Sequence, residues 1–171
     1  MTSGPRDHPI VEQIPHLRRY ARALIGDRTM AEDLVQDCLE RAWSRLHLWR
    51  EGSNLRTWLF TIMHNLHANA ARSASRRPST VPLDEPGAAA PTRAVQEDGL
   101  EVASIDAALA MLPDEQRQVI LLVGLEGMSY QEAAAVLDVP IGTVMSRLHR
   151  GRERLRQILT GSGGTALRRV K

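Results

Sequence analysis

Residues 129–158, near the C-terminal end of the sequence, constrain the fold more than any other stretch. Ser129 can cap a helix, and Glu132, three residues later, can complete a capping box. Pro140 favours the end of that helix, because the residue before a proline disfavours the α region, and it suits the first turn of a following helix. The stretch therefore predicts two helices joined by a tight turn, and the second helix can lie in a DNA groove.

The second of these helices has one apolar face and one polar face bordered by arginines. At about 100° per residue, its apolar stripe contains Val144, Leu148, Gly151, Leu155 and Ile158. A polar centre with arginines on both sides suits a helix that reads base edges while its borders contact phosphates. A solvated face on an ordinary helical hairpin is the alternative. The centre consists of Met145, Ser146, His149, Arg150 and Glu153, and the borders of Arg147, Arg152, Arg154 and Arg156.

The bulk composition favours a cytoplasmic protein. The 171 residues suffice for one domain or two small ones, and 43% apolar with 25% charged residues is ordinary for a globular chain. No run of apolar residues is long enough to span a membrane, and the polar N-terminus lacks the apolar core of a signal peptide. The single cysteine, Cys38, excludes an internal disulfide and a cysteine-based metal cage.

Charge is distributed unevenly along a chain whose net charge is only +2. Residues 1–77 contain 12 arginines and 8 acids, whereas residues 78–111 contain 1 arginine and 6 acids. Residues 112–171 contain 9 basic and 6 acidic residues. Nearly all the positive charge is arginine, which suits contacts to phosphate and guanine. A genome-wide arginine bias is an alternative cause.

The N-terminal part predicts three helices. The first covers 8–25, with Ile14, Leu17, Ala21 and Leu24 facing inward. Thr29 is expected to cap the second helix, with Glu32 completing a capping box. The second helix has a wide apolar face, and its other side is an acidic and amide ridge that is either solvated or docks a basic partner. That ridge contains Glu32, Asp33, Gln36, Asp37 and Glu40.

The third helix follows a loop at 50–54 and has an uncharged polar face. Hydroxyl, imidazole and amide groups on one face, with arginines at one end, fit nucleic acid. Four of the six aromatic residues fall between Trp43 and Phe60; they can stack on bases, but for Trp43 and Trp58 we favour the core. The face contains Thr57, Thr61, His64, Asn65, Ala68 and Arg72.

Residues 77–100 are acidic and proline-rich, so we expect a flexible linker. After it, a short helix at 101–111 is expected to turn Ile105, Leu109 and Leu112 inward, and Pro113 begins another helix. The expected fold is all-α, with two small helical domains, at 1–76 and 101–160, joined by that linker. The C-terminal domain contains the helix-turn-helix, and a Gly-rich tail at 161–171 is expected to be disordered.

No pattern in the sequence indicates catalysis. It contains no phosphate-binding glycine loop and no Gly-x-Ser-x-Gly motif. His64 and His67 lie three residues apart on one helix, but no third metal ligand is near them in sequence. We therefore expect neither an enzyme, nor a cofactor, nor a metal site.

Three stretches together resemble bacterial RNA polymerase sigma factors of the extracytoplasmic-function group. They are AEDLVQDCLERAW, NLRTWLFTIMHN, and the segment from LPDEQRQVILLVGLEGMSYQEA to the end of the helix-turn-helix. The resemblance covers about residues 8–76 and 101–159, which correspond to sigma region 2 and sigma region 4. It implies a protein that directs core polymerase to promoters and assists promoter opening, with an anti-sigma factor as a further partner.

The resemblance also implies roles for particular residues. The ridge Asp33, Gln36, Asp37 and Glu40 corresponds to the surface that docks the β′ clamp coiled coil, and the helix from 113 to the surface that meets the β flap. The expected −10 contacts are Arg50, Ser53, Asn54, Thr57, Thr61, His64, Asn65 and Arg72. The expected −35 contacts are Thr143, Met145, Ser146, Arg147, His149, Arg150, Arg152 and Arg154. Met145 stands where several members have arginine.

Energetics favour a subunit of a larger machine. Opening about ten base steps costs roughly 14 kcal/mol, at about 1.4 kcal/mol each. Capturing two bases returns only about 2–6 kcal/mol. The alternatives are a stand-alone helix-turn-helix regulator, which leaves residues 28–77 without a role, a sigma-mimicking protein that binds an anti-sigma factor, and an uncharacterised enzyme.

Overall fold

The computed structural model describes residues 9–50, 52–76 and 105–163, and these ranges hold helices and turns without any strand. The all-α prediction is therefore confirmed for the described residues. The predicted linker at 77–100, residues 101–104 of the expected short helix, and the tail from 164 onward lie outside the described residues. None of the described helices is long and apolar enough to cross a membrane.

Three long helices form the N-terminal half: α1 (Pro9–Ile25), α2 (Arg28–Ser44) and α3 (Leu55–Arg76). A 3₁₀ turn, η1 (Leu46–Leu48), follows α2. Gly26 separates α1 from α2 at φ +81°, a left-handed conformation that glycine adopts without a steric penalty. The core of this half is aliphatic with one aromatic pair, Tyr20 and Phe60, whose rings meet edge-on at 5.2 Å.

The predicted cap of the second helix is wrong. Asp27, not Thr29, is the N-cap residue, and its carboxylate accepts from the backbone N–H of Met30 at 2.8 Å. Met30, not Glu32, is three residues after this cap, and the Glu32 carboxylate instead accepts from Arg18 at 3.0 Å and from Arg22 at 2.7 Å, both on α1. The Glu32 carboxylate, which the local sequence pattern predicted to accept from a backbone N–H group, therefore forms ion pairs between α2 and α1.

The C-terminal half begins with a helical segment at 105–110 and continues with α5 (Asp114–Ile120). A short π-helical segment, η2 (Leu121–Leu125), leads to α6 (Tyr130–Leu137) and α7 (Ile141–Gly163). The predicted capping box is confirmed, since Ser129 and Glu132 bond reciprocally to each other's backbone N–H groups. Asp138 ends α6 in the left-handed conformation, at φ 52°.

The predicted inward residues are largely, but not entirely, buried. Leu109, Leu112, Val144 and Leu148 are buried as expected, whereas Ile105 is 43% exposed. Trp43 is also exposed, at 45%, so the expectation that it fills the core is wrong, whereas Trp58 packs against the core. Helix α7 continues to Gly163, so the predicted start of the tail at 161 is too early.

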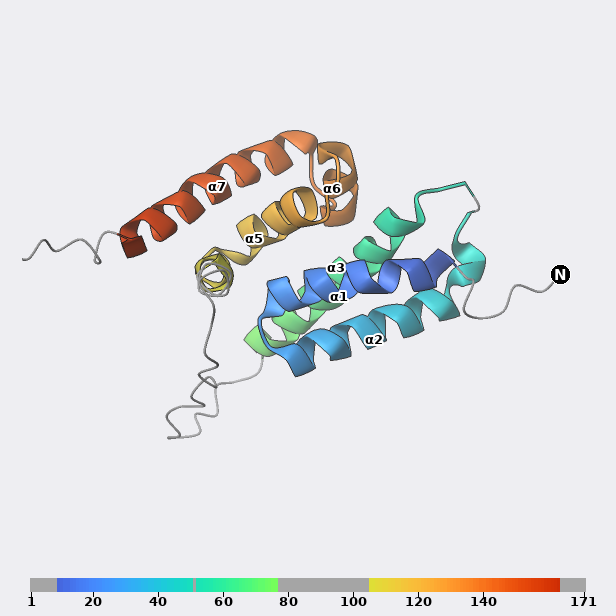
Figure 1. Cartoon of the computed structure of the whole chain (residues 1–171). Helices are drawn as coiled ribbons and strands as arrows, with labels where there is room; N and C mark the ends of the chain where they lie inside the picture. Colours follow the sequence, from blue (N-terminus) through green and yellow to red (C-terminus); the bar gives the residue numbers. More distant parts are fainter. Residues whose placement is uncertain (1–8, 51, 77–104, 164–171) are drawn as a thin grey trace, which may run out of the picture.

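The two halves pack against each other and share one cluster of buried side chains. Figure 1 shows α1, α2 and α3 grouped side by side, with α5, α6 and α7 forming a second group beside them. Helix α3 contacts α6, and α1 contacts η2. The face that joins the halves therefore includes α3, the helix expected to contact DNA.

Candidate nucleic-acid and polymerase interfaces

The outward face of α7 is available to a ligand along most of its predicted length. Met145 is 52% exposed, and Ser146, His149 and Arg150 are also exposed. The Arg150 guanidinium donates to the Ser146 backbone oxygen at 3.3 Å and lies 3.4 Å from its hydroxyl, so it lies along the helix. At the borders, Arg152 and Arg154 are exposed, and Thr143 at the start of the helix is half-buried.

One predicted border residue lies elsewhere. The Arg147 guanidinium donates to Glu115 of α5 at 2.9 Å, and only 20% of its side chain is exposed. Arg147 therefore joins α7 to α5 within the C-terminal half, and it is not free for a phosphate in this arrangement. Helical periodicity alone could not reveal this, because it does not tell which neighbour covers the edge of a helix.

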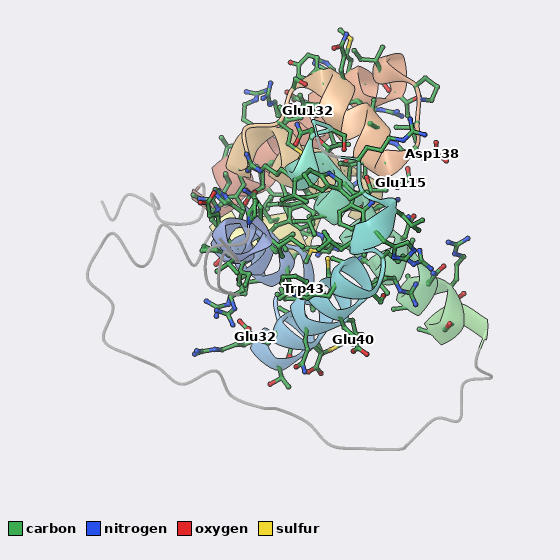
Figure 2. The ribbon with its side chains drawn as sticks, turned by 90° about the vertical axis from the view of Figure 1, so that its right-hand side faces the viewer. Glu32, Glu40, Trp43, Glu115, Glu132 and Asp138 are labelled. Atoms are coloured by element: carbon green, nitrogen blue, oxygen red, sulfur yellow. The ribbon has the colours of Figure 1, made fainter. Side chains whose placement is uncertain are left out.

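The ridge on α2 is open to solvent, since Asp33, Gln36, Asp37 and Glu40 are all exposed. Glu32 differs from them, because hydrogen bonds from Arg22 and Arg18 lower the pKa of its carboxyl and tie it to α1. In Figure 2, Glu40 lies on the N-terminal half, at the opposite end of the view from Glu132 and Asp138 of the C-terminal half. The Glu40 end of the ridge thus lies away from the C-terminal half, whereas Asp33 and Asp37 line a hollow together with Arg117 of α5.

The residues expected at the −10 element are divided between solvent and the contact between the halves. Arg50 and Ser53 are exposed in the loop before α3, and Asn65 and Arg72 are exposed farther along α3. Arg72 donates to the Ala68 carbonyl and to Asn69 on its own helix. The remaining predicted contacts, Asn54, Thr57, Thr61 and His64, lie against or beside the C-terminal half.

Asn54 bonds in two directions. Its amide oxygen accepts from the Thr57 backbone N–H at 3.1 Å, and its amide nitrogen donates to Glu132 of α6 at 2.7 Å. Thr57 and Thr61 are half-buried and line a shallow hollow of about 450 Å³ together with Glu132 and Ala135 of the other half. Helix α6 therefore borders the polar face of α3.

His64 and His67 both contact α5. His64 lies 2.8 Å from the Gln118 amide oxygen, and burial lowers its pKa. His67 lies 3.1 Å from Asp114, and this hydrogen bond lowers the pKa of the Asp114 carboxyl. Both histidines thus have protein partners, and no group of three or more potential metal ligands occurs among the residues that the structure describes.

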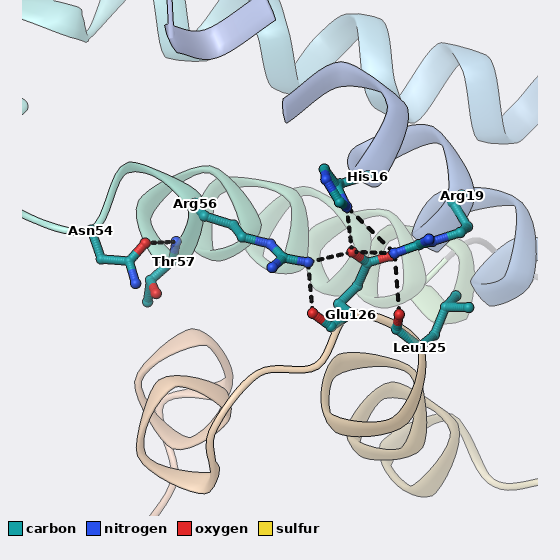
Figure 3. A network of polar contacts seen from close by, with 7 residues as sticks. All are labelled: His16, Arg19, Asn54, Arg56, Thr57, Leu125 and Glu126. Carbon is teal, nitrogen blue, oxygen red and sulfur yellow. Dashed lines mark hydrogen bonds and ion pairs between the residues drawn. The ribbon is translucent and has the colours of Figure 1, made fainter. Parts of the chain in front are cut away.

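A buried carboxylate that the sequence reasoning missed lies at the centre of the contact between the halves. The side chain of Glu126, just after η2, is 0% exposed. It accepts from Arg19 at 3.0 Å and from Arg56 at 2.6 Å, and it lies 3.1 Å from His16 (Figure 3). The only signal in the sequence was a single carboxylate beside the apolar run LLVGL, which gives no hint of three distant partners.

Comparisons with known proteins agree with this architecture. The family model described as the Sigma2 domain of PhyR matches residues 10–64, and the model of Sigma-70 region 4 matches residues 103–155. The two matches correspond to the two halves of the structure.

Relatives and solved structures agree over nearly the whole chain. The ECF RNA polymerase sigma factor EcfG of Rhodopseudomonas palustris is 38% identical over 95% of this chain and 89% of its own length. The sigma factor RpoE of Bartonella quintana, solved with the anti-sigma factor NepR, is 37% identical with a TM-score of 0.75, covering 88% of this chain and 94% of that one. CnrH, solved with the cytosolic domain of CnrY, is 28% identical with a TM-score of 0.65 and covers 89% and 85%. Together with the two helical halves and the exposed arginine-bordered face of α7, these similarities show that the chain belongs to the extracytoplasmic-function RNA polymerase sigma factors.

Proposed function

We propose that this sigma factor directs core polymerase to its promoters through three separate surfaces. The exposed face of α7 reads the −35 element, the region around the start of α3 captures the −10 element, and the α2 ridge docks the β′ coiled coil. We assign the −10 and polymerase surfaces to a domain at 1–76 and the −35 surface to a domain beginning near 101. The chain acts in the cytoplasm and catalyses no reaction itself.

The observation that carries the proposal is the composition of the exposed face of α7. Ser146, His149 and Arg150 can donate to base edges, and Arg152 and Arg154 beside them are exposed and suit phosphates. A helix that is merely solvent-exposed does not require base-reading groups at the centre of its face and arginines along its borders. The half-buried Arg147 is left out of the proposed contact set because Glu115 already holds it.

The α2 ridge supports the polymerase contact through charge and accessibility. Asp33, Asp37 and Glu40 are all exposed on one side of α2. Such a surface suits a basic partner helix, because complementary charges steer association and suppress wrong partners. We further propose that α5 meets the β flap and that an anti-sigma factor binds this chain, since RpoE, which it resembles, was solved with the anti-sigma factor NepR.

Reconstitution with core polymerase and a library of promoters tests the proposal. We expect transcription to select a defined pair of −35 and −10 sequences, and core polymerase alone to select none. A chain that binds core polymerase but gives no selected transcripts would contradict the assignment of the DNA-reading surfaces.

A second candidate has one specific observation in its favour: the model that matches residues 10–64 is described by a PhyR domain rather than by a sigma factor. Under this alternative, the chain would imitate a sigma factor and bind an anti-sigma factor without reading DNA. The same reconstitution separates the two, because an imitator gives no promoter-specific transcript, and substitutions on the face of α7 would leave its binding to a partner unchanged.

A further inference from the structure

Three side chains of the N-terminal half converge on one point of its surface. His16 and Arg19 come from α1 and Arg56 comes from α3, so all three belong to helices that pack together within one half. Their nitrogens lie 2.6–3.1 Å from the Glu126 carboxylate oxygens. Figure 3 shows the three side chains pointing toward this carboxylate. We call Arg19 and Arg56, with His16 beside them, the cation cluster; its positive charge is that of the two arginines.

The cation cluster has the chemistry of an anion-binding site. Arg19 gives Glu126 two parallel bonds, both at 3.0 Å, which is the fork geometry by which arginine binds carboxylate and phosphate. The Arg56 guanidinium lies over the Phe60 ring, 5.8 Å from its centre, and this contact restricts its position. Like charges held this close repel each other, so the cluster requires either an anion or full hydration.

In this structure, the anion is supplied by the C-terminal half of the same chain. The Glu126 side chain is completely buried, and its backbone oxygen accepts a further bond from Arg56 at 2.7 Å. Arg19 also donates to the Leu125 carbonyl at 3.1 Å. Beside this cluster, Asn54 donates to Glu132 of α6, so a second carboxylate of the C-terminal half engages a residue of the −10 surface proposed above.

We propose that the cation cluster is a binding site for a backbone phosphate of the −10 promoter strand, and that Glu126 occupies it while the two halves are closed. The ligand is a phosphodiester because the cluster lies beside the loop and the α3 start that we assign to the −10 element, and phosphate contacts position a protein on DNA independently of sequence. The inference rests on the proposed function. It adds that closure of the halves and binding of promoter DNA compete for one group of cations.

The test uses the full chain without polymerase, with fluorescein-labelled single-stranded DNA of mixed sequence as the probe. The separation of the halves is followed by energy transfer between dyes on Ser44→Cys of α2 and Thr160→Cys of α7, both exposed. The native Cys38 does not interfere, because it is buried and its thiol has a pKa raised to about 12 by burial. Labels therefore go only to the introduced cysteines.

Glu126→Gln keeps the size of the side chain and removes its charge. We expect the distance between the halves to increase and the affinity for the probe to rise by about tenfold or more, because the apparent affinity of a site scales with the fraction of molecules in which it is open. Arg56→Gln should also increase the distance, but without the gain in affinity. In the double variant, Glu126→Gln with Arg56→Gln, the gain in affinity should disappear. The slope of log affinity against log salt concentration should become shallower by about 0.7 for each phosphate that the protein no longer neutralises.

Glu32→Gln is the matched control. Glu32 also binds two arginines, Arg18 and Arg22, but both lie in its own half, so the control removes the same charge and releases two arginines without separating the halves. The proposal is overturned if Glu126→Gln leaves the distance unchanged, if its gain in affinity does not exceed that of Glu32→Gln, or if the gain persists without Arg56.

If Glu126→Gln has a lower helical content than the wild type, the proposal is tested with Arg19→Gln and Arg56→Gln instead. Both must then increase the distance without raising the affinity, and an unchanged distance in either overturns the proposal. Because polymerase is absent, failure here is distinguishable from failure of the proposed α2 contact, which is measured with polymerase and with different variants.

Discussion

Arg147 of α7 donates to Glu115 of α5 across 2.9 Å, and this contact removes a predicted phosphate-binding residue from the DNA face. We expect Arg147→Ala to lower the free energy of unfolding by about 1 kcal/mol, because a surface ion pair contributes about 0–1 kcal/mol and the packed alkyl stem adds to it. Preference for the −35 sequence and the salt dependence of DNA binding should not change. Urea unfolding and binding at two salt concentrations measure these effects.

Arg154→Ala is the comparison for that experiment, since Arg154 is exposed on the same helix. Arg154→Ala should change the free energy of unfolding by no more than about 0.5 kcal/mol, and it should lower the slope of log DNA affinity against log salt concentration by about one. If Arg147→Ala lowers the slope as much as Arg154→Ala does, the pair with Glu115 opens when DNA binds and our exclusion of Arg147 is wrong.

The centre and the border of the α7 face should respond differently to substitution. Arg150 is exposed beside Ser146 at the centre, whereas Arg156 lies near the end of the face and pairs with Glu153 at 2.9 Å. Arg150→Ala should relax selection at one or two −35 positions, since a good base contact gives about 1–3 kcal/mol of discrimination. Arg156→Ala should weaken binding to all sequences alike. Transcription by reconstituted holoenzyme from randomised −35 elements provides the profile, and the same shift in both variants would contradict these roles.

Reversing charge on the α2 ridge should weaken binding to core polymerase. Asp37 and Glu40 are exposed, so replacing both with arginine should leave the fold intact. We expect affinity to fall by about tenfold or more, because like charges placed across an interface cost several kcal/mol and about 1.4 kcal/mol is tenfold. Glu12→Arg, an exposed acid on α1, is the control. Equal co-purification of the double variant and the control with core polymerase would exclude the ridge as the docking surface.

The capping box of α6 should contribute measurably to stability. Ser129→Ala removes the hydroxyl that accepts from the Glu132 backbone N–H at 3.2 Å, and losing such a cap typically costs about 0.5–2 kcal/mol. Chemical unfolding measures the loss. Thr29→Ala is a matched control, because Thr29 does not cap α2 and Asp27 does. An equal loss in both variants would mean that the measured effect is not due to capping.

The capping box also predicts the sign of one pH dependence. Hydrogen bonds from Ser129 lower the pKa of Glu132 below its ordinary value of 4.5, so the unfolded chain binds the proton more tightly. This contribution to stability is present above pH 4.5 and is lost as the pH falls from there through the lowered pKa. Glu132→Gln should remove that part of the acid dependence, and an unchanged slope below pH 4.5 would contradict it.

The sequence by itself determined the features that depend on neighbouring residues. The Ser129 and Glu132 box, the break before Pro140 and the apolar stripe through Val144 and Leu148 are all confirmed. Capping bonds and helical faces act over three or four residues, so the residue pattern contains the information for them. The family was equally accessible, because three motifs in order identify a sigma factor without any knowledge of their packing.

Only the tertiary structure decided which polar groups remain available. Glu32 binds two arginines of α1 instead of capping α2. Arg147 pairs with Glu115, and His64 contacts Gln118. Glu126 shows the reason most clearly, since its partners Arg19 and Arg56 are 107 and 70 residues away in the chain. Burying a carboxylate is favourable only when cations surround it, and which distant cations reach it depends on how the two halves pack.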